Sequence, residues 1–216
     1  MRTLALPIAF ALAITATLVA PTTLLAQEPP AVTTVEQAPG FHVAAIAQWV
    51  TYEAGLATKC PSVQADWAKA THHLYGTPTT APNGNLVNAT WVETVPGTAC
   101  GQQRRYRVLV TVRSGRAGMQ ALLPGNSYAS PTLERDARFP MIGAAEAFVP
   151  AGQKCAVDVI DTHLIAAPTA PKQPWNEVWT VTTCGKRLSV PIRFVPDATG
   201  DGTSIQIESK TVKPLP

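Results

Sequence analysis

The sequence predicts an α+β, β-rich fold of two tandem antiparallel β-meander repeats, with short helical connectors and one disulfide in each repeat. One stretch occurs twice, at residues 91–101 and 175–185, with Trp, Glu, Thr, Cys and Gly at the same five offsets. Segments rich in β-branched residues alternate with Pro, Gly and Asn turns, which is typical of meanders. The landmarks that define the repeat are Trp91, Glu93 and Gly101 in the first copy and Trp175, Glu177 and Gly185 in the second.

The first 26 residues have the pattern of a secretory signal peptide. Met1-Arg2 gives a positive start, residues 4–20 are almost wholly apolar, and Ala26 precedes Gln27. We therefore expect residues 1–26 to be a signal peptide cleaved after Ala26, and the protein to be periplasmic or secreted. An uncleaved anchor is the alternative, because the apolar run nearly reaches spanning length. No membrane span is expected after signal removal.

The charge of the chain is small. The formal net charge is +3, and removal of the signal would take away one arginine. A value this low predicts no nucleic-acid partner and no attraction to acidic membranes. Alternation along a strand would divide the arginine cluster between two faces, so we interpret it as a solvated strand surface rather than an anion site. The cluster consists of Arg104, Arg105, Arg107, Arg113 and Arg116.

We expect the chain to consist of four segments: the signal peptide, a linker and two repeats. Residues 27–40 carry Pro29, Pro30 and Pro39 without apolar periodicity, which predicts a flexible, extended linker. Residues 41–126 form the first repeat, and residues 127–216 form the second, with a helical connector at its start. A period near 90 residues is too long for a solenoid unit, so two β-rich units from a duplication fit better.

The second repeat gives the clearer strand pattern. Residues 156–165, 175–183, 188–195 and 203–209 are four strand candidates separated by turn residues. Pro191 lies inside the third, which indicates an edge or a bulge there. Period-two alternation places one set of side chains on a common face: Trp175, Glu177, Trp179, Val181 and Thr183.

The first repeat and the helices are less regular. Residues 61–75 fit both helical and strand spacing, and equivalence with residues 156–165 favours the strand. Ser130 before Pro131 suits an N-cap, so we expect a helix from near Thr132 that resumes through residues 142–147 after Pro140. Residues 41–52 are its expected counterpart.

The mature chain contains four cysteines, an even number that favours two disulfides in an oxidising compartment. In a hairpin, paired residues lie equally far from the turn. The midpoint of Cys155 and Cys184 falls in the Pro-marked loop 166–174, and that of Cys60 and Cys100 falls in the loop 77–84. We therefore predict the disulfides Cys60–Cys100 and Cys155–Cys184.

No sequence motif for catalysis is present, and we predict no catalytic, cofactor-binding or metal-binding residues. Residues 197–208 resemble an EF-hand loop, but a Gly-rich turn between two strands explains them more simply. His73 and His163 hold equivalent repeat positions, yet an exposed histidine near a hairpin tip is the simpler interpretation.

The element Trp175-x-Glu-x-Trp-Thr-Val-x-x-Cys-Gly185, with Leu133-x-Arg-Asp-Ala137 before it and Val190-Pro191 after it, resembles a group of uncharacterised secreted or periplasmic proteins of Gram-negative bacteria. The likeness covers roughly residues 122–207. It implies a location outside the cytoplasm and no activity. We expect a non-enzymatic binding or structural protein of the envelope, whose partner is another envelope or secreted protein. The alternative is a cell-envelope hydrolase without a recognisable motif. Glutamate, aspartate or histidine converging in a deep pocket would favour the enzyme.

Overall fold

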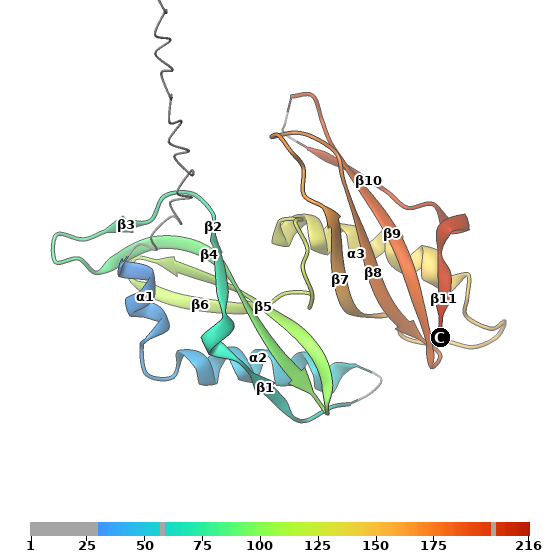
Figure 1. Cartoon of the computed structure of the whole chain (residues 1–216), viewed down its shortest axis with the longest axis horizontal. Helices are drawn as coiled ribbons and strands as arrows, with labels where there is room; N and C mark the ends of the chain where they lie inside the picture. The colour runs from blue at the N-terminus through green and yellow to red at the C-terminus, as the bar shows by residue number, and fades with distance from the viewer. Residues whose placement is uncertain (1–29, 57–58, 200–201) are drawn as a thin grey trace, which may run out of the picture.

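The computed structural model describes residues 30–56, 59–199 and 202–216, which form two α+β units (Figure 1). The signal peptide expected at residues 1–26 lies outside this part of the chain. Each unit contains one antiparallel sheet, so the predicted β-rich fold class is confirmed. The first unit comprises α1 Pro30–Glu36, α2 Phe41–Gly55, β1 Val63–Ala65, η1 Trp67–Lys69, β2 Thr71–Leu74, β3 Thr79–Thr80, β4 Leu86–Ala99, β5 Gln102–Arg113 and β6 Arg116–Ala121. The second comprises α3 Pro131–Glu146, β7 Asp158–Ala166, β8 Trp175–Thr183, β9 Lys186–Pro196, β10 Thr203–Gln206, η2 Ser209–Thr211 and β11 Lys213–Leu215.

Both sheets are meanders with the same order. The first runs β1-β4-β5-β6, and β2 and β3 also pair with β4. The second runs β7-β8-β9-β10, and β11 pairs with the outer side of β9. Residues 61–75 form two short strands around the turn η1, so the strand interpretation is confirmed with one interruption.

One face of each sheet is covered by a helix. In the first unit, α2 packs on β1, β5 and β6 and buries a stripe at every fourth position, Phe41, Ala45, Trp49 and Glu53. In the second, α3 packs on β8 and β9 in the same way. The alternation predicted for β8 is confirmed, because every second side chain from Trp175 to Thr183 is buried.

The repeated Cys-Gly pairs are hairpin turns. Cys100 and Gly101 have φ of 46° and 79°, and Cys184 and Gly185 have φ of 49° and 73°. Two consecutive residues with positive φ between antiparallel strands are what a type I′ turn requires, and glycine adopts this conformation at no steric cost. The predicted pairings Cys60–Cys100 and Cys155–Cys184 are both confirmed, so each disulfide joins the turn to the segment between the long helix and the first strand of its own unit.

The strand β9 bears on two sequence expectations, the edge or bulge at Pro191 and the turn after Asp197. Its outer side pairs with β11 at residues 187–189 and with β10 at residues 193–196. Pro191, which has no N–H to donate, falls in the gap between them, where the strand is locally an edge. Strands flank the segment after Asp197 on both sides, as the Gly-rich turn predicted, whereas an EF-hand loop is flanked by helices; residues 200–201 of this segment lie outside the described part of the chain.

Two expectations are corrected. The linker expected over residues 27–40 contains the helix α1, and the Val32 side chain is fully buried in the first core. Proline at a first helical position is pre-organised for a helix, and this apolar anchor ties the segment down. The helix α3 also continues through Pro140 instead of breaking there, because that residue lies on its exposed face. The Ser130 cap is confirmed, since its hydroxyl accepts from the Leu133 N–H at 3.3 Å.

The connector of residues 122–130 joins the two units and bonds to both sheets. The N–H groups of Leu122 and Gly125 donate to carbonyls of β5, and the next residue, Asn126, exchanges backbone bonds with β7. Gly125 has a φ of 111°, and a Cβ there would lie 2.2 Å from the Thr162 carbonyl oxygen. Only glycine permits this approach, so the crossing point is fixed by one residue.

We expect the double variants Cys60→Ser/Cys100→Ser and Cys155→Ser/Cys184→Ser each to lose about 4 kcal/mol of unfolding free energy, because opening these loops restores chain entropy to the unfolded state. Urea denaturation followed by tryptophan fluorescence measures the loss. Non-reducing peptide maps of the wild type provide the control for connectivity. A variant with an unchanged urea midpoint would contradict the stabilising role of its disulfide.

Candidate binding cleft between the two units

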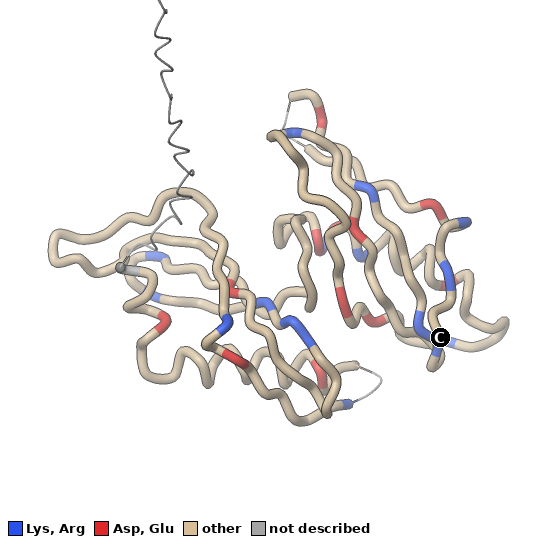
Figure 2. Tube along the Cα trace, in the orientation of Figure 1, with Lys and Arg blue, Asp and Glu red and all other residues tan. Residues whose placement is uncertain are grey.

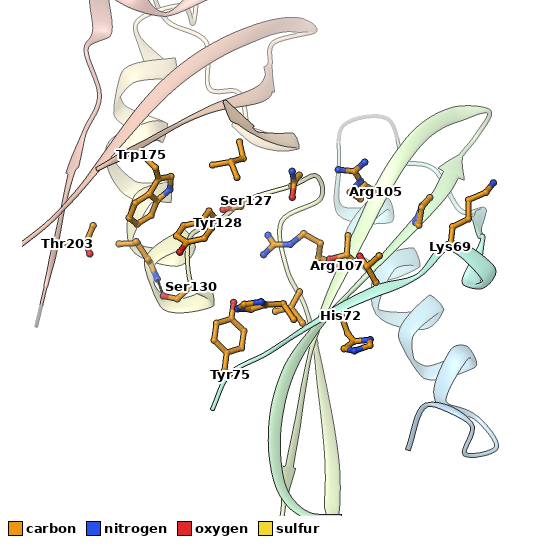
Figure 3. Close-up of a pocket in the computed structure, with 18 residues that line it drawn as sticks. Lys69, His72, Tyr75, Arg105, Arg107, Ser127, Tyr128, Ser130, Trp175 and Thr203 are labelled. Carbon is orange, nitrogen blue, oxygen red and sulfur yellow. Dashed lines mark hydrogen bonds between the residues drawn. The ribbon is translucent and has the colours of Figure 1, made fainter. Parts of the chain in front are cut away.

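A cleft of about 740 Å³ lies between the two units (Figure 3). One wall is the face of the first sheet that carries no helix. The other is formed by the end of the connector, the first turn of α3 and the start of β8. This volume is in the range of small-molecule sites in proteins. The polar and aromatic groups of the lining are Lys69, Thr71, His72, His73, Tyr75, Thr94, Arg105, Arg107, Asn126, Ser127, Tyr128, Ser130, Trp175 and Thr203.

Strand alternation decides which side chains of the first unit reach the cleft. Cross-strand partners lie on one face, and β4 pairs Thr94 with Arg107 of β5 and Pro96 with Arg105. The residues of β4 at the alternate positions, such as Trp91 and Glu93, point to the helix-covered core on the other face. The first sheet is therefore a core wall on one side and a cleft wall on the other.

The cleft lining is cationic. Lys69, Arg105 and Arg107 contribute to it, and none of the residues that line it is an aspartate or a glutamate. Figure 2 shows basic positions on the part of β5 nearest the second unit. Lys69 pairs with Asp66 at 2.7 Å in an exposed contact, and Arg107 pairs with a buried carboxylate. Arg105 is exposed, forms no ion pair within the described part of the chain, and borders both this cleft and a smaller cavity beside it.

Aromatic rings form the other part of the lining. The Tyr128 ring meets Trp175 edge-on at 5.2 Å between centroids, and the His73 ring meets Tyr75 edge-on at 5.0 Å. Burial raises the pKa of the Tyr75 hydroxyl, so this group is protonated at neutral pH and can donate a hydrogen bond. The cleft thus combines flat apolar surfaces with donors.

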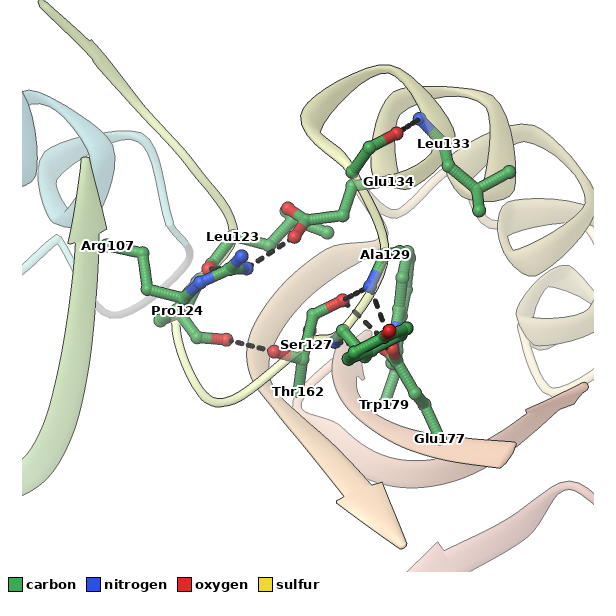
Figure 4. A network of polar contacts seen from close by, with 12 residues as sticks. Arg107, Leu123, Pro124, Ser127, Ala129, Leu133, Glu134, Thr162, Glu177 and Trp179 are labelled. Carbon is green, nitrogen blue, oxygen red and sulfur yellow. Dashed lines mark hydrogen bonds and ion pairs between the residues drawn. The ribbon is translucent and has the colours of Figure 1, made fainter. Parts of the chain in front are cut away.

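A single buried carboxylate holds the second wall in place (Figure 4). Glu177 is fully buried on β8, and its Oε1 accepts from the Ser127 hydroxyl and from the backbone N–H groups of Tyr128 and Ala129 at 2.9–3.2 Å. The indole N–H groups of Trp175 and Trp179 donate to its two oxygens at 3.0 and 2.8 Å. Five donors satisfy the charge of this carboxylate, which explains why it is stable in the core.

A buried ion pair crosses between the units. The Arg107 guanidinium on β5 bonds to the Glu134 carboxylate in the first turn of α3, and both side chains are almost wholly buried. Burial raises the pKa of the Glu134 carboxyl, and the adjacent guanidinium opposes that rise. The expectation of a solvated arginine surface is therefore wrong for Arg107. It is also wrong for Arg104, which bonds the buried Glu53 at 3.1 Å.

A smaller cavity of about 440 Å³ adjoins the connector on the side of β7. Asp161 and His163 line it together with Arg104, Arg105 and Asn126. Desolvation raises the pKa of the Asp161 carboxyl, and His163 opposes the rise. The two histidines considered from the sequence thus border different cavities, His73 the larger and His163 the smaller.

The repeat landmarks take structural positions rather than one common site. Trp91 donates its indole N–H to Glu93 at 3.2 Å, which matches the bond from Trp175 to Glu177. Of these residues, only Trp175 lines the cleft. Sequence reasoning missed Arg105 and Arg107 as cleft residues, although their period-two spacing on β5 already placed them on one face.

No family model, curated protein or solved structure matches this chain.

We expect Arg107→Met to lower the unfolding free energy by about 3–5 kcal/mol, because it leaves the Glu134 carboxylate buried without its countercharge. The double variant Arg107→Met/Glu134→Met should recover most of this loss. Urea denaturation measures both.

The matched control is Lys69→Met, which breaks an exposed ion pair and should leave the urea midpoint nearly unchanged. Equal effects of Arg107→Met and Lys69→Met would show that the inter-unit pair contributes no more than a surface contact.

Proposed function

We propose that this protein is a non-enzymatic, extracytoplasmic binding protein whose ligand occupies the cleft between the two units. The observation that carries the proposal is the lining itself, which offers cations, donors and aromatic rings but no carboxylate. Such a lining attracts an anion, and it contains no negatively charged side chain that would repel one. It contains no carboxylate that could act as a general acid or base.

The ligand that this lining suits has an anionic group next to a flat or apolar part. Arg105 would pair with the anion, and Tyr75 can donate to it. Tyr128 and Trp175 would contact the apolar part. Another envelope or secreted protein that inserts an acidic, aromatic segment is one source of this chemistry, and an organic acid is another.

The alternative of a cell-envelope hydrolase rests on the smaller cavity, where Asp161 and His163 both line the wall and His163 opposes the rise in the pKa of the Asp161 carboxyl. A hydrolase that acts through a covalent intermediate would also need a nucleophile in this cavity. The hydroxyl of Thr162 is buried and donates to the Pro124 carbonyl at 2.8 Å, so it is engaged in structure. Binding in the larger cleft is therefore the better supported function.

The extracytoplasmic location is supported by two intramolecular disulfides and by the signal pattern of residues 1–26. Among the described residues, no helix is long and apolar enough to cross a bilayer. The duplication is supported by the common order of helix, cysteine, strands and Cys-Gly turn in both units, and by the shared Trp-to-Glu bond.

Ligand chemistry can be tested with two dyes that share a scaffold. We expect 8-anilinonaphthalene-1-sulfonate to bind saturably and the uncharged N-phenyl-1-naphthylamine to bind more weakly, because only the first carries an anion. Arg105→Ala should weaken the sulfonate dye by roughly tenfold, the loss of one charged hydrogen bond, and leave the neutral dye unchanged. Fluorescence titration measures all four affinities.

Arg113→Ala is the matched control, since Arg113 lies on the same strand and face but outside the cleft. Equal loss in both variants, or equal affinity for the two dyes, would contradict an anion site in the cleft. Capture from envelope extract by wild type and Arg113→Ala, but not by Arg105→Ala, would identify a protein as the source of the ligand.

We expect intact-mass analysis of protein from the periplasm or culture medium of an expressing Gram-negative bacterium to show a chain that begins at Gln27, because cleavage should follow Ala26. A membrane-bound chain that retains residues 1–26 would support the uncleaved anchor instead.

A further inference from the structure

We propose that Glu36, His72 and Glu93 bind a divalent transition-metal ion on the helix-covered side of the first sheet. The three residues come from the end of α1, from β2 and from β4, and one ligand atom of each lies within 4.8 Å of the other two. Glu93 is buried, and the other two are half-buried. His72 also borders the cleft, whereas Glu36 and Glu93 do not line it, and the site goes beyond the proposed binding function.

Strand register brings His72 and Glu93 together. They are direct partners in the antiparallel pairing of β2 with β4, so their side chains lie on the same face. His73, the next residue of β2, is on the opposite face and lines the cleft. Both histidines border the cleft, but their side chains leave the strand in opposite directions, and in Figure 3 the His72 ring points away from the Arg105 and Arg107 side chains.

The second unit shows what the equivalent carboxylate needs. Glu93 and Glu177 hold the same place in the repeat, and each accepts an indole N–H from the tryptophan two residues before it. Around Glu177 the further neighbours are protein hydrogen-bond donors. Close to Glu93 lie the imidazole of His72 and a second carboxylate, that of Glu36. Two carboxylates so close together in a largely buried place are stabilised by a cation between them.

The donor set selects the class of metal. One imidazole nitrogen and two carboxylate oxygens suit Zn²⁺ and neighbouring first-row ions, and three protein ligands leave a position for water. Tetrahedral ligands at about 2.0–2.1 Å from Zn²⁺ lie about 3.3 Å apart. Side-chain rotations that shorten the present separations by at most about 1.5 Å would complete the geometry. The Trp91 indole, bonded to Glu93 Oε2, would orient that ligand from outside the coordination sphere.

A metal at this site would fasten α1 to the sheet. The helix is seven residues long, too short to be stable alone, and Val32 is its fully buried anchor in the core. Coordination by Glu36 would add a second attachment at the other end of the helix. Binding to the folded state alone should raise the Tm.

The test is isothermal titration of Zn²⁺ into the full protein, purified without a histidine tag and dialysed against EDTA and then metal-free buffer. We expect one equivalent to bind. His72→Ala and Glu36→Gln should each weaken binding by more than the roughly 10–100-fold typical of a lost outer-shell contact. His73→Ala, the adjacent histidine on the opposite face, should bind as the wild type does.

Two further readouts separate coordination from a general effect on folding. Zn²⁺ should raise the Tm of the wild type and of His73→Ala but not that of His72→Ala, whose circular dichroism should be unchanged. Co²⁺ should give visible absorption bands in the same two proteins only. Absence of saturable binding to the wild type, or equal binding by His72→Ala and His73→Ala, would overturn the proposal.

Discussion

The geometry of the cleft depends on the few backbone bonds that attach the connector to both sheets. The N–H of Gly125 reaches β5, and that of Asn126 reaches β7. The cleft walls therefore meet at two consecutive residues. Three side-chain contacts support this junction: the buried Arg107–Glu134 pair, the Tyr52 hydroxyl bonded to the Val159 carbonyl at 2.6 Å, and the Thr162 hydroxyl bonded to Pro124. The cleft forms because the units are joined side by side at their sheets.

Glu93 and Glu177 lie at corresponding places of the two units but have different neighbours. Each is held by the tryptophan two residues earlier on its strand. In the second unit the carboxylate organises a connecting loop and thus one wall of the cleft. In the first unit the loop donors are replaced by a helix terminus and a histidine. The same Trp-to-Glu hydrogen bond is thus combined with different neighbours in the two units.

Features governed by local chemistry could be predicted from the sequence, and features governed by distant contacts could not. The cap at Ser130, the alternation of β8 and both disulfides follow from residues a hairpin or a helical turn apart. The burial of Arg107 depends on Glu134, which belongs to the other unit, so no local pattern reveals it. The helix α1 has too few residues for a periodic signal, and its burial rests on Val32. The cleft lies between elements whose relative position no sequence period encodes.

The two disulfides stabilise each unit separately. Each disulfide closes a ring within one unit, and no sulfur bridge passes from one unit to the other. The hairpins are thus protected by bonds that oxidising surroundings maintain. The spacing of the cleft walls depends instead on a single polypeptide crossing and on weak forces. A cut in the peptide chain near Gly125 would leave two intact rings with only these weak forces between them.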